Sequence, residues 1–152
     1  MAPLRLALAS PRFWPLMGDG PDHLLALADS LAAAGHVVTV VTPQWKRTWP
    51  RQMTIGRISL IRLRGSGRGG WSTLRWMYSL ASWLADQTQL DGILAAQLRH
   101  EAYVALGSSS KSRTPVVVLA GEGDLAWQRT AAFGSRIRVA FSGCHSIFDL
   151  LH

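Results

Sequence analysis

Short apolar runs alternate with longer segments of helical periodicity along this chain of 152 residues. Leu4–Ala9 is a short apolar run, which predicts a buried strand. Apolar residues then recur at helical spacing over Leu24–Ala32, with Pro21 suited to the first helical position and Gly35 to the C-terminal cap. His36–Thr42 is rich in β-branched residues, which predicts a second buried strand. These segments indicate a βαβ unit with a right-handed crossover.

The alternation continues along the rest of the chain. Further strands are predicted over residues 55–63, 92–96, 115–119 and 138–141, and helices over 72–86, 101–109 and near 125–132. This order predicts an α/β fold: a Rossmann-like, doubly wound, mainly parallel sheet with helices on both faces.

The last residues predict one more element. Residues 146–151 have the pattern of an amphipathic helix that stops without a cap or a polar tail. We therefore expect residues 1–152 to be a single domain that is cut off within a larger protein.

Composition excludes several classes of protein. Apolar residues make up 48% of the chain and charged residues 16%, which is too apolar for a disordered chain. The single cysteine, Cys144, excludes an internal disulfide and a zinc site built on paired cysteines. No signal peptide is present, and no apolar stretch reaches the roughly 18 residues of a membrane span. A cytoplasmic location, with membrane association as a possibility, is expected.

Charge is concentrated in one part of the chain. The net charge is +7, yet no acidic residue occurs between Asp29 and Asp86, where eight of the Lys and Arg residues and five of the seven tryptophans lie. This segment suggests a surface for anionic membrane or for a partner protein. The residues assigned to that surface are Lys46, Arg47, Arg51, Trp76 and Trp83. Nucleic acid is not expected, because no recognised binding motif accompanies the charge.

The predicted helix from Ser72 carries two apolar stripes, and the role of the second stripe distinguishes a membrane-binding surface from a wider core. Its core-facing stripe is predicted to be Leu74, Met77, Tyr78, Ala81 and Leu84. A second stripe of Trp76, Leu80 and Trp83 lies beside it. The tryptophans of that stripe either face a membrane or widen the core-facing stripe, in which case the arginines are simply solvated.

Ligands of open parallel sheets bind beyond the carboxyl ends of the strands. The loop after the first strand, residues 11–20, is longer than usual, and Gly18 and Gly20 could present backbone amides to a phosphate beside Arg12. The alternative is that the glycines only make the turn while the aromatic residues before them close the sheet edge. A dinucleotide fingerprint is not expected, because His23 stands where its third glycine should be.

Two other loops carry polar residues at the same edge. After the strand 115–119 come Glu122 and Asp124, which could bind sugar hydroxyls or act as a base, unless Asp124 only caps a helix. After the strand 92–96 come Gln97 and His100, with a surface or cap role as the alternative for the histidine. Adjacent residues on a helix do not face each other, so Cys144 and the histidine after it are not expected to form a catalytic dyad.

The run RLALASPRFWPLMGDGPDHLLALADSLAAAGHVVTVVTP resembles the opening of family 4 glycosyltransferases of the GT-B fold. LDGILAAQ, PVVVLAGEGD and RIRVAFSGCHSIFDLL are similar to that family's fourth, fifth and sixth strands. The resemblance covers nearly the whole chain, but only the N-terminal, acceptor-side domain of the family. It implies transfer of a sugar from a nucleotide-sugar donor with retention of configuration, without a metal or another cofactor.

The resemblance also assigns residues. Gly18 and Asp19 match the family's paired glycines near the donor phosphates, with Asp19 departing from the pattern. Gly121 falls where many members carry a functional histidine, and Glu122 beside it is the catalytic candidate. The donor-binding domain is absent, so this chain alone is expected to be inactive. The alternative is a non-catalytic module that binds anionic membrane or a partner through segment 46–83.

Overall fold

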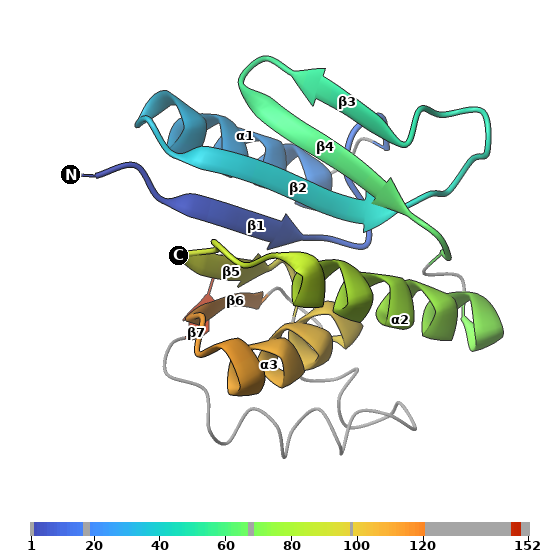
Figure 1. The fold of residues 1–152 in the computed structure, drawn as a ribbon. Coiled ribbons are helices and arrows are strands. Elements are labelled where there is room, and N and C mark those ends of the chain that lie inside the picture. The colour runs from blue at the N-terminus through green and yellow to red at the C-terminus, as the bar shows by residue number, and fades with distance from the viewer. Residues whose placement is uncertain (1, 17–18, 67–68, 98, 121–146, 150–152) are drawn as a thin grey trace.

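The computed structural model describes residues 2–16, 19–66, 69–97, 99–120 and 147–149, which form a seven-stranded sheet with three helices (Figure 1). Its strand order is β3-β4-β2-β1-β5-β6-β7, and all neighbours are parallel except β3 and β4. The strands are β1 Arg5–Ala9, β2 Val37–Pro43, β3 Gln52–Ile55, β4 Ile58–Leu63, β5 Gly92–Ala95, β6 Val116–Ala120 and β7 Ile147–Asp149. The helices are α1 Asp19–Ala33, α2 Gly70–Asp86 and α3 His100–Ser112.

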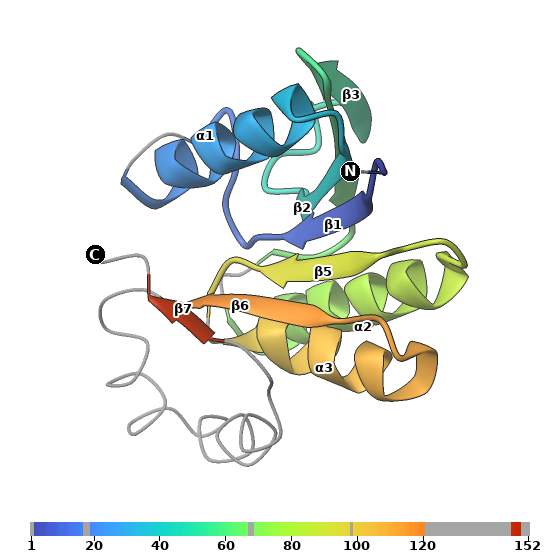
Figure 2. The same ribbon diagram turned by 90° about the vertical axis from the view of Figure 1, so that its left-hand side faces the viewer.

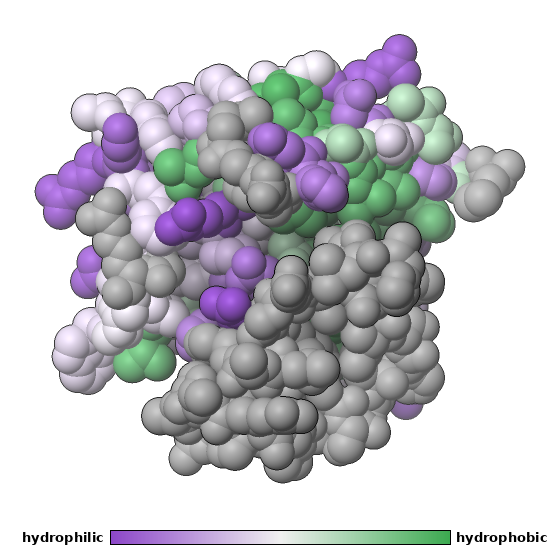
Figure 3. Space-filling model, turned by 180° about the vertical axis from the view of Figure 1, so that it is seen from behind, coloured by the Kyte–Doolittle hydropathy of each residue, from purple (hydrophilic) through white to green (hydrophobic). Residues whose placement is uncertain are grey.

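Helices cover both faces of the sheet, which confirms the predicted fold class (Figure 2). Successive residues of a strand point to opposite faces, so Leu8 packs under α1 whereas Ala7 and Ala9 face α2 and α3. Figure 3 shows the α1 side, where apolar side chains gather in the upper part of the molecule. No helix in the described part of the chain is long and apolar enough to cross a bilayer.

The predicted βαβ unit is present, with a different helix start. Leu24, Ala28 and Ala32 are buried, and α1 ends before Gly35 as predicted. The helix begins at Asp19, two residues before the predicted start at Pro21. Proline is tolerated in this first turn because amides there have no intrahelical partner. Asp19 and the glycine after it therefore belong to the helix and not to the preceding loop.

The single strand predicted over residues 55–63 is interrupted by a hairpin turn: Ile55 ends the first arm, β3, and Ile58–Leu63 form the second arm, β4. β3 and β4 are antiparallel, and Ile55 pairs with Ile58 across a two-residue turn. Gly56 adopts a φ of 57° in that turn, a conformation that glycine reaches without steric cost. The glycine within the predicted strand was the signal for this break.

At the end of the chain the sequence prediction was wrong. Ile147–Asp149 is a strand, β7, parallel to β6, where an amphipathic helix was expected over 146–151. Val118 pairs with Ile147 in this register. A short apolar run fits a buried strand as well as a helix, and the free edge of β6 decides the outcome here. The strand predicted at 138–141 and the helix near 125–132 lie outside the described residues.

The core-facing side of α2 was predicted correctly for Leu84 and in part for Met77, and wrongly for Leu74 and Tyr78. Trp76 is 0% exposed and, with Thr73, Leu80 and Leu84, faces the sheet, whereas Tyr78 is 78% exposed. Leu74, also assigned to the core, is half exposed, and Trp83 packs partly buried against the core. The small side chains that β1 presents to α2 leave room for the Trp76 indole.

Trp76 therefore does not belong to the membrane-facing surface that the sequence suggested, whereas Trp83 is only partly buried. The indole nitrogen of Trp76 donates a hydrogen bond of 2.9 Å to Oε1 of the buried Glu101 on α3. This bond joins the two helices on that face. The core-widening alternative is confirmed for Trp76.

Candidate functional site

The carboxyl ends of three adjacent strands bring their loops together. Ala9 at the end of β1 lies opposite Val41 of β2 and Ala95 of β5. The Ser10 amide donates to the Val41 carbonyl at 3.0 Å, and the Ala96 amide donates to the Ala9 carbonyl at 2.9 Å. The chain passes from β1 to β2 on one side and reaches β5 on the other. This edge is a topological switch point, where open α/β sheets bind ligands.

The loop after β1 is anchored by an aromatic side chain. Phe13 is buried in the core under α1, and its carbonyl accepts the Leu16 amide at 2.9 Å. Trp14 remains 37% exposed and joins Pro15 by a cis peptide bond. The expectation that aromatic residues close the sheet edge is therefore confirmed for Phe13 only.

Arg12 from this loop reaches the next one. Its guanidinium is exposed and lies over the Trp45 ring, 5.6 Å from the centroid. The Trp45 indole donates to the Pro11 carbonyl at 2.7 Å, and the Ser10 hydroxyl accepts the Arg12 amide at 3.3 Å. The structure thus places the predicted cation Arg12 beside the loop that carries Lys46.

A buried arginine that sequence analysis did not select holds these loops together. Arg62 is 3% exposed at the end of β4, and its guanidinium donates to the carbonyls of Pro50 at 2.6 Å and Trp14 at 3.2 Å. It also lies 5.3 Å from the centroid of Trp49, which Lys46 approaches to 5.4 Å. Burial lowers the pKa of the Arg62 guanidinium from its ordinary value.

The signal for Arg62 was present in the sequence. It follows Ile58 and Leu60 in the inward phase of the strand, and both of those residues are buried. An arginine in the buried phase at the end of a strand needs polar partners there. Such a residue predicts that loops pack around the end of the strand, but the sequence does not identify which groups accept its hydrogen bonds.

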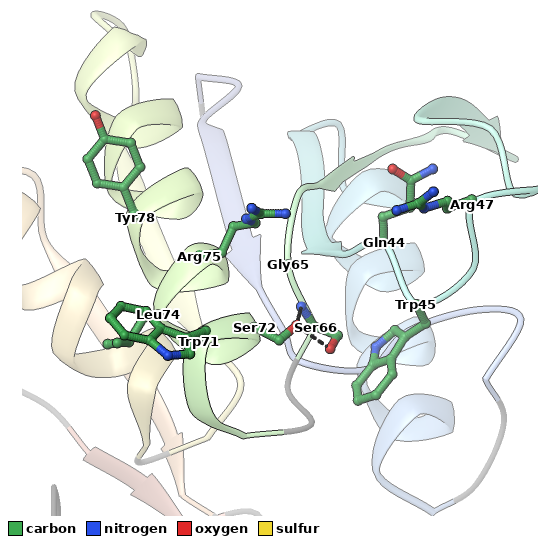
Figure 4. Close-up of a pocket in the computed structure, with 10 residues that line it drawn as sticks. All are labelled: Gln44, Trp45, Arg47, Gly65, Ser66, Trp71, Ser72, Leu74, Arg75 and Tyr78. Atoms are coloured by element: carbon green, nitrogen blue, oxygen red, sulfur yellow. Dashed lines mark hydrogen bonds between the residues drawn. The ribbon is translucent and has the colours of Figure 1, made fainter.

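An open groove of about 850 Å³ lies between the β2–β3 loop and α2 (Figure 4). Arg75 extends from α2 toward Gly65, with Trp45 and Arg47 on the other side of that segment (Figure 4). A neighbouring cavity of about 470 Å³ is lined by Arg47, Arg51 and Arg75 together with Gln44, Arg64 and Gly65. Two of the predicted surface residues, Arg47 and Arg51, therefore line one cationic groove.

The segment after β4, whose Gly65 and Ser66 line this groove, is hydrogen-bonded to the first turn of α2. Ser66 donates its amide to the Ser72 hydroxyl at 2.9 Å, and the two hydroxyl oxygens are 2.6 Å apart. Gly65 has a φ of 105°, and a Cβ there would come within 2.4 Å of the Trp76 amide nitrogen. The loop therefore needs glycine at this position to lie against the helix.

Gln97 and His100 lie on the other side of the switch point, after β5. Both are partly buried, and His100 is the first residue of α3. Burial, with a smaller contribution from the positive charge of Arg99, lowers the pKa of His100 from its ordinary value near 6.5. The imidazole is therefore neutral at pH 7 and able both to donate and to accept a hydrogen bond.

We expect the His100 ring protons to titrate in an NMR pH series with a midpoint below 6.5. Because the unfolded chain binds this proton more readily, the free energy of unfolding should decrease as the pH falls from about 6.5 through the folded-state pKa. Arg99→Gln should move the midpoint upward, since it removes a like charge. A wild-type midpoint at or above 6.5 would contradict this assignment.

Four predicted site residues, Gly18, Gly121, Glu122 and Asp124, lie outside the described residues, as does Cys144. Asp19 and Gly20 are placed in the first turn of α1. Within the described residues, no three His, Cys, Asp or Glu side chains gather in a way that could hold a metal ion.

Comparison with known proteins points to one architecture. No protein-family model and no curated protein sequence matches the chain. A solved structure of sucrose-phosphate synthase from Thermosynechococcus elongatus matches with a TM-score of 0.69 at 13% identity, covering 95% of this chain and 75% of that one. The fold resembles one half of a GT-B glycosyltransferase. A second structure of the same enzyme matches with a TM-score of 0.66 at 14% identity, and there the chain spans 41% of the enzyme's length.

Proposed function

We propose that this domain is the acceptor-side half of a glycosyltransferase that transfers a sugar from a nucleotide-sugar donor. The observation that carries the proposal is the similarity to sucrose-phosphate synthase over 95% of the chain. The switch-point edge supports it, because the loops that carry Arg12, Gln97 and His100 start there from adjacent ends of β1 and β5. The donor-binding half would be supplied by a further domain.

Four of the candidate residues have a proposed role in this reaction. Arg12 would neutralise part of the donor diphosphate from its position on Trp45. Gln97 and the neutral His100 would hydrogen-bond sugar hydroxyls. Glu122, proposed from the sequence, would accept the proton of the attacking hydroxyl.

Binding measurements with matched variants test this role. Nucleoside diphosphate sugars should bind this domain with a Kd on the order of millimolar, because only half of the cleft is present. Gln97→Ala and His100→Ala should each weaken binding roughly fivefold, the loss of about one hydrogen bond. Gln89→Ala, an exposed residue before β5, should leave it unchanged. Equal effects of all three variants would contradict the proposed site.

A turnover assay tests the claim that the domain is half of an enzyme. Incubation of the domain with a nucleoside diphosphate sugar and free hexoses should release no nucleoside diphosphate above the buffer control. Catalytic release by the purified domain, lost in Glu122→Gln, would show that the second half is not needed.

Binding to anionic membrane through segment 46–83 remains the second candidate function. Trp76 is buried in the core and Trp83 is partly buried, but Trp71 is 87% exposed on the first turn of α2, next to the cationic groove. The lipid arm of the experiment below tests it.

A further inference from the structure

We propose that the groove between the β2–β3 loop and α2 is a binding site for a phosphate group carried on an apolar or ring-bearing molecule. The phosphate would lie among the arginines, and its apolar portion along the outer face of α2. Such a ligand could come from a phosphorylated soluble compound or from a phospholipid, which present the same chemistry.

The arginines give the groove its charge. Arg47, Arg51, Arg64 and Arg75 line one cavity of about 470 Å³, and no carboxylate of the described residues lines it. Four like charges around one cavity repel each other, and a bound dianion relieves that repulsion. Guanidinium groups also match phosphate oxygens with paired N–H donors.

The outer face of α2 gives the groove its apolar side. Trp71, Leu74 and Tyr78 recur at helical spacing and line the larger cavity together with Arg75. They are exposed by 87%, 50% and 78%, so no part of the described chain covers them. Aromatic surface next to arginine is a common way to hold a ring or an acyl chain beside its charged group.

The groove is built before any ligand arrives. The hydroxyl groups of Ser66 and Ser72 contact each other and hold the segment after β4 against the helix. The side-chain amide of Gln44 holds the β2–β3 loop by donating to the Trp49 carbonyl at 3.1 Å. The backbone amide of Gln44 also donates to the Leu63 carbonyl at 2.8 Å. Little ordering free energy is then lost on binding.

Phosphate binding to this groove does not rest on the proposed function. The two can fail separately. Substitutions of the groove arginines should leave the effect of His100→Ala on nucleotide-sugar binding unchanged, and His100→Ala should leave phosphate binding to the groove unchanged.

Calorimetric titration at low salt tests the site with three soluble probes: inorganic phosphate, phenyl phosphate and a hexose 6-phosphate. Arg75→Gln and Arg64→Gln should each weaken binding of all three roughly tenfold, the loss of one charge-assisted contact. Arg57→Gln is the matched control, because it removes the same charge from the exposed β3–β4 turn. Trp71→Ala should weaken phenyl phosphate about fivefold and leave inorganic phosphate unchanged.

Flotation with phosphatidylcholine vesicles, with and without phosphatidic acid, forms the lipid arm. Binding of the soluble probes alone supports a soluble phosphate ligand, and flotation that needs phosphatidic acid and is lost in Arg75→Gln supports a lipid phosphate. Equal losses in Arg75→Gln and Arg57→Gln would overturn the site and leave only diffuse charge. Failure of every probe and of the acidic vesicles at low salt would also overturn it.

Discussion

Trp76→Ala is expected to lower the free energy of unfolding by about 3–5 kcal/mol, because it removes the largest fully buried side chain among the described residues. The substitution leaves a cavity between α2, α3 and the sheet. It also removes the indole donor from Oε1 of the buried Glu101. Urea denaturation of wild type and variant, followed by circular dichroism, measures the difference.

Two variants separate packing from hydrogen bonding in this result. Trp76→Phe keeps most of the ring volume and loses the donor, so we expect a cost of about 1–2 kcal/mol. Trp71→Ala removes an indole that is 87% exposed on the same helix and should stay within about 0.5 kcal/mol of wild type. Equal costs for Trp71→Ala and Trp76→Ala would mean that the core face of α2 is assigned to the wrong side.

Arg62→Met is expected to lower the free energy of unfolding by about 2–4 kcal/mol. Methionine retains much of the side-chain length but leaves the carbonyls of Pro50 and Trp14 without their guanidinium donor. The cation–π contact with Trp49 is lost as well. Removing the desolvated charge offsets part of this cost.

The same substitution should loosen the loops after β1 and β2, which Arg62 joins together with the Trp45–Pro11 hydrogen bond and the Arg12–Trp45 contact. Backbone amides of residues 12–16 and 46–51 should exchange faster with deuterium than in wild type. Arg57→Met, on the exposed hairpin turn, is the control and should change neither stability nor exchange. Unchanged exchange in Arg62→Met would show that the loops hold their positions without it.

Much of the first half of the fold followed from local patterns. Leu24, Ala28 and Ala32 repeat at a period that only a helix satisfies, and the β-branched run after them has no helical phase. The side of α2 that faces the sheet could not be derived in this way. Two apolar stripes compete on that helix, and the buried one, which contains Trp76, packs in one cluster with residues far away in the sequence such as Ala7 and Ala9.

The candidate site was predictable in position and less so in its parts. The rule that ligands bind beyond the carboxyl ends of parallel strands led to Arg12, Gln97 and His100. Arg75 on α2 and Arg64 after β4 were not selected, because their convergence with Arg47 and Arg51 depends on the β2–β3 loop folding back toward the helix. Arg62 could not be selected for a similar reason: Trp14, whose carbonyl accepts one of its hydrogen bonds, lies 48 residues earlier in the sequence.

Mapping of amide chemical shifts on the 15N-labelled domain during titration with a nucleoside diphosphate sugar tests the central claim most directly. If this is half of a glycosyltransferase, shifts should appear at Ser10, Arg12, Gln97 and His100, at the switch-point edge. Shifts confined to the opposite edge, near Val37, or no shift at the carboxyl edge at the highest donor concentration, would contradict it.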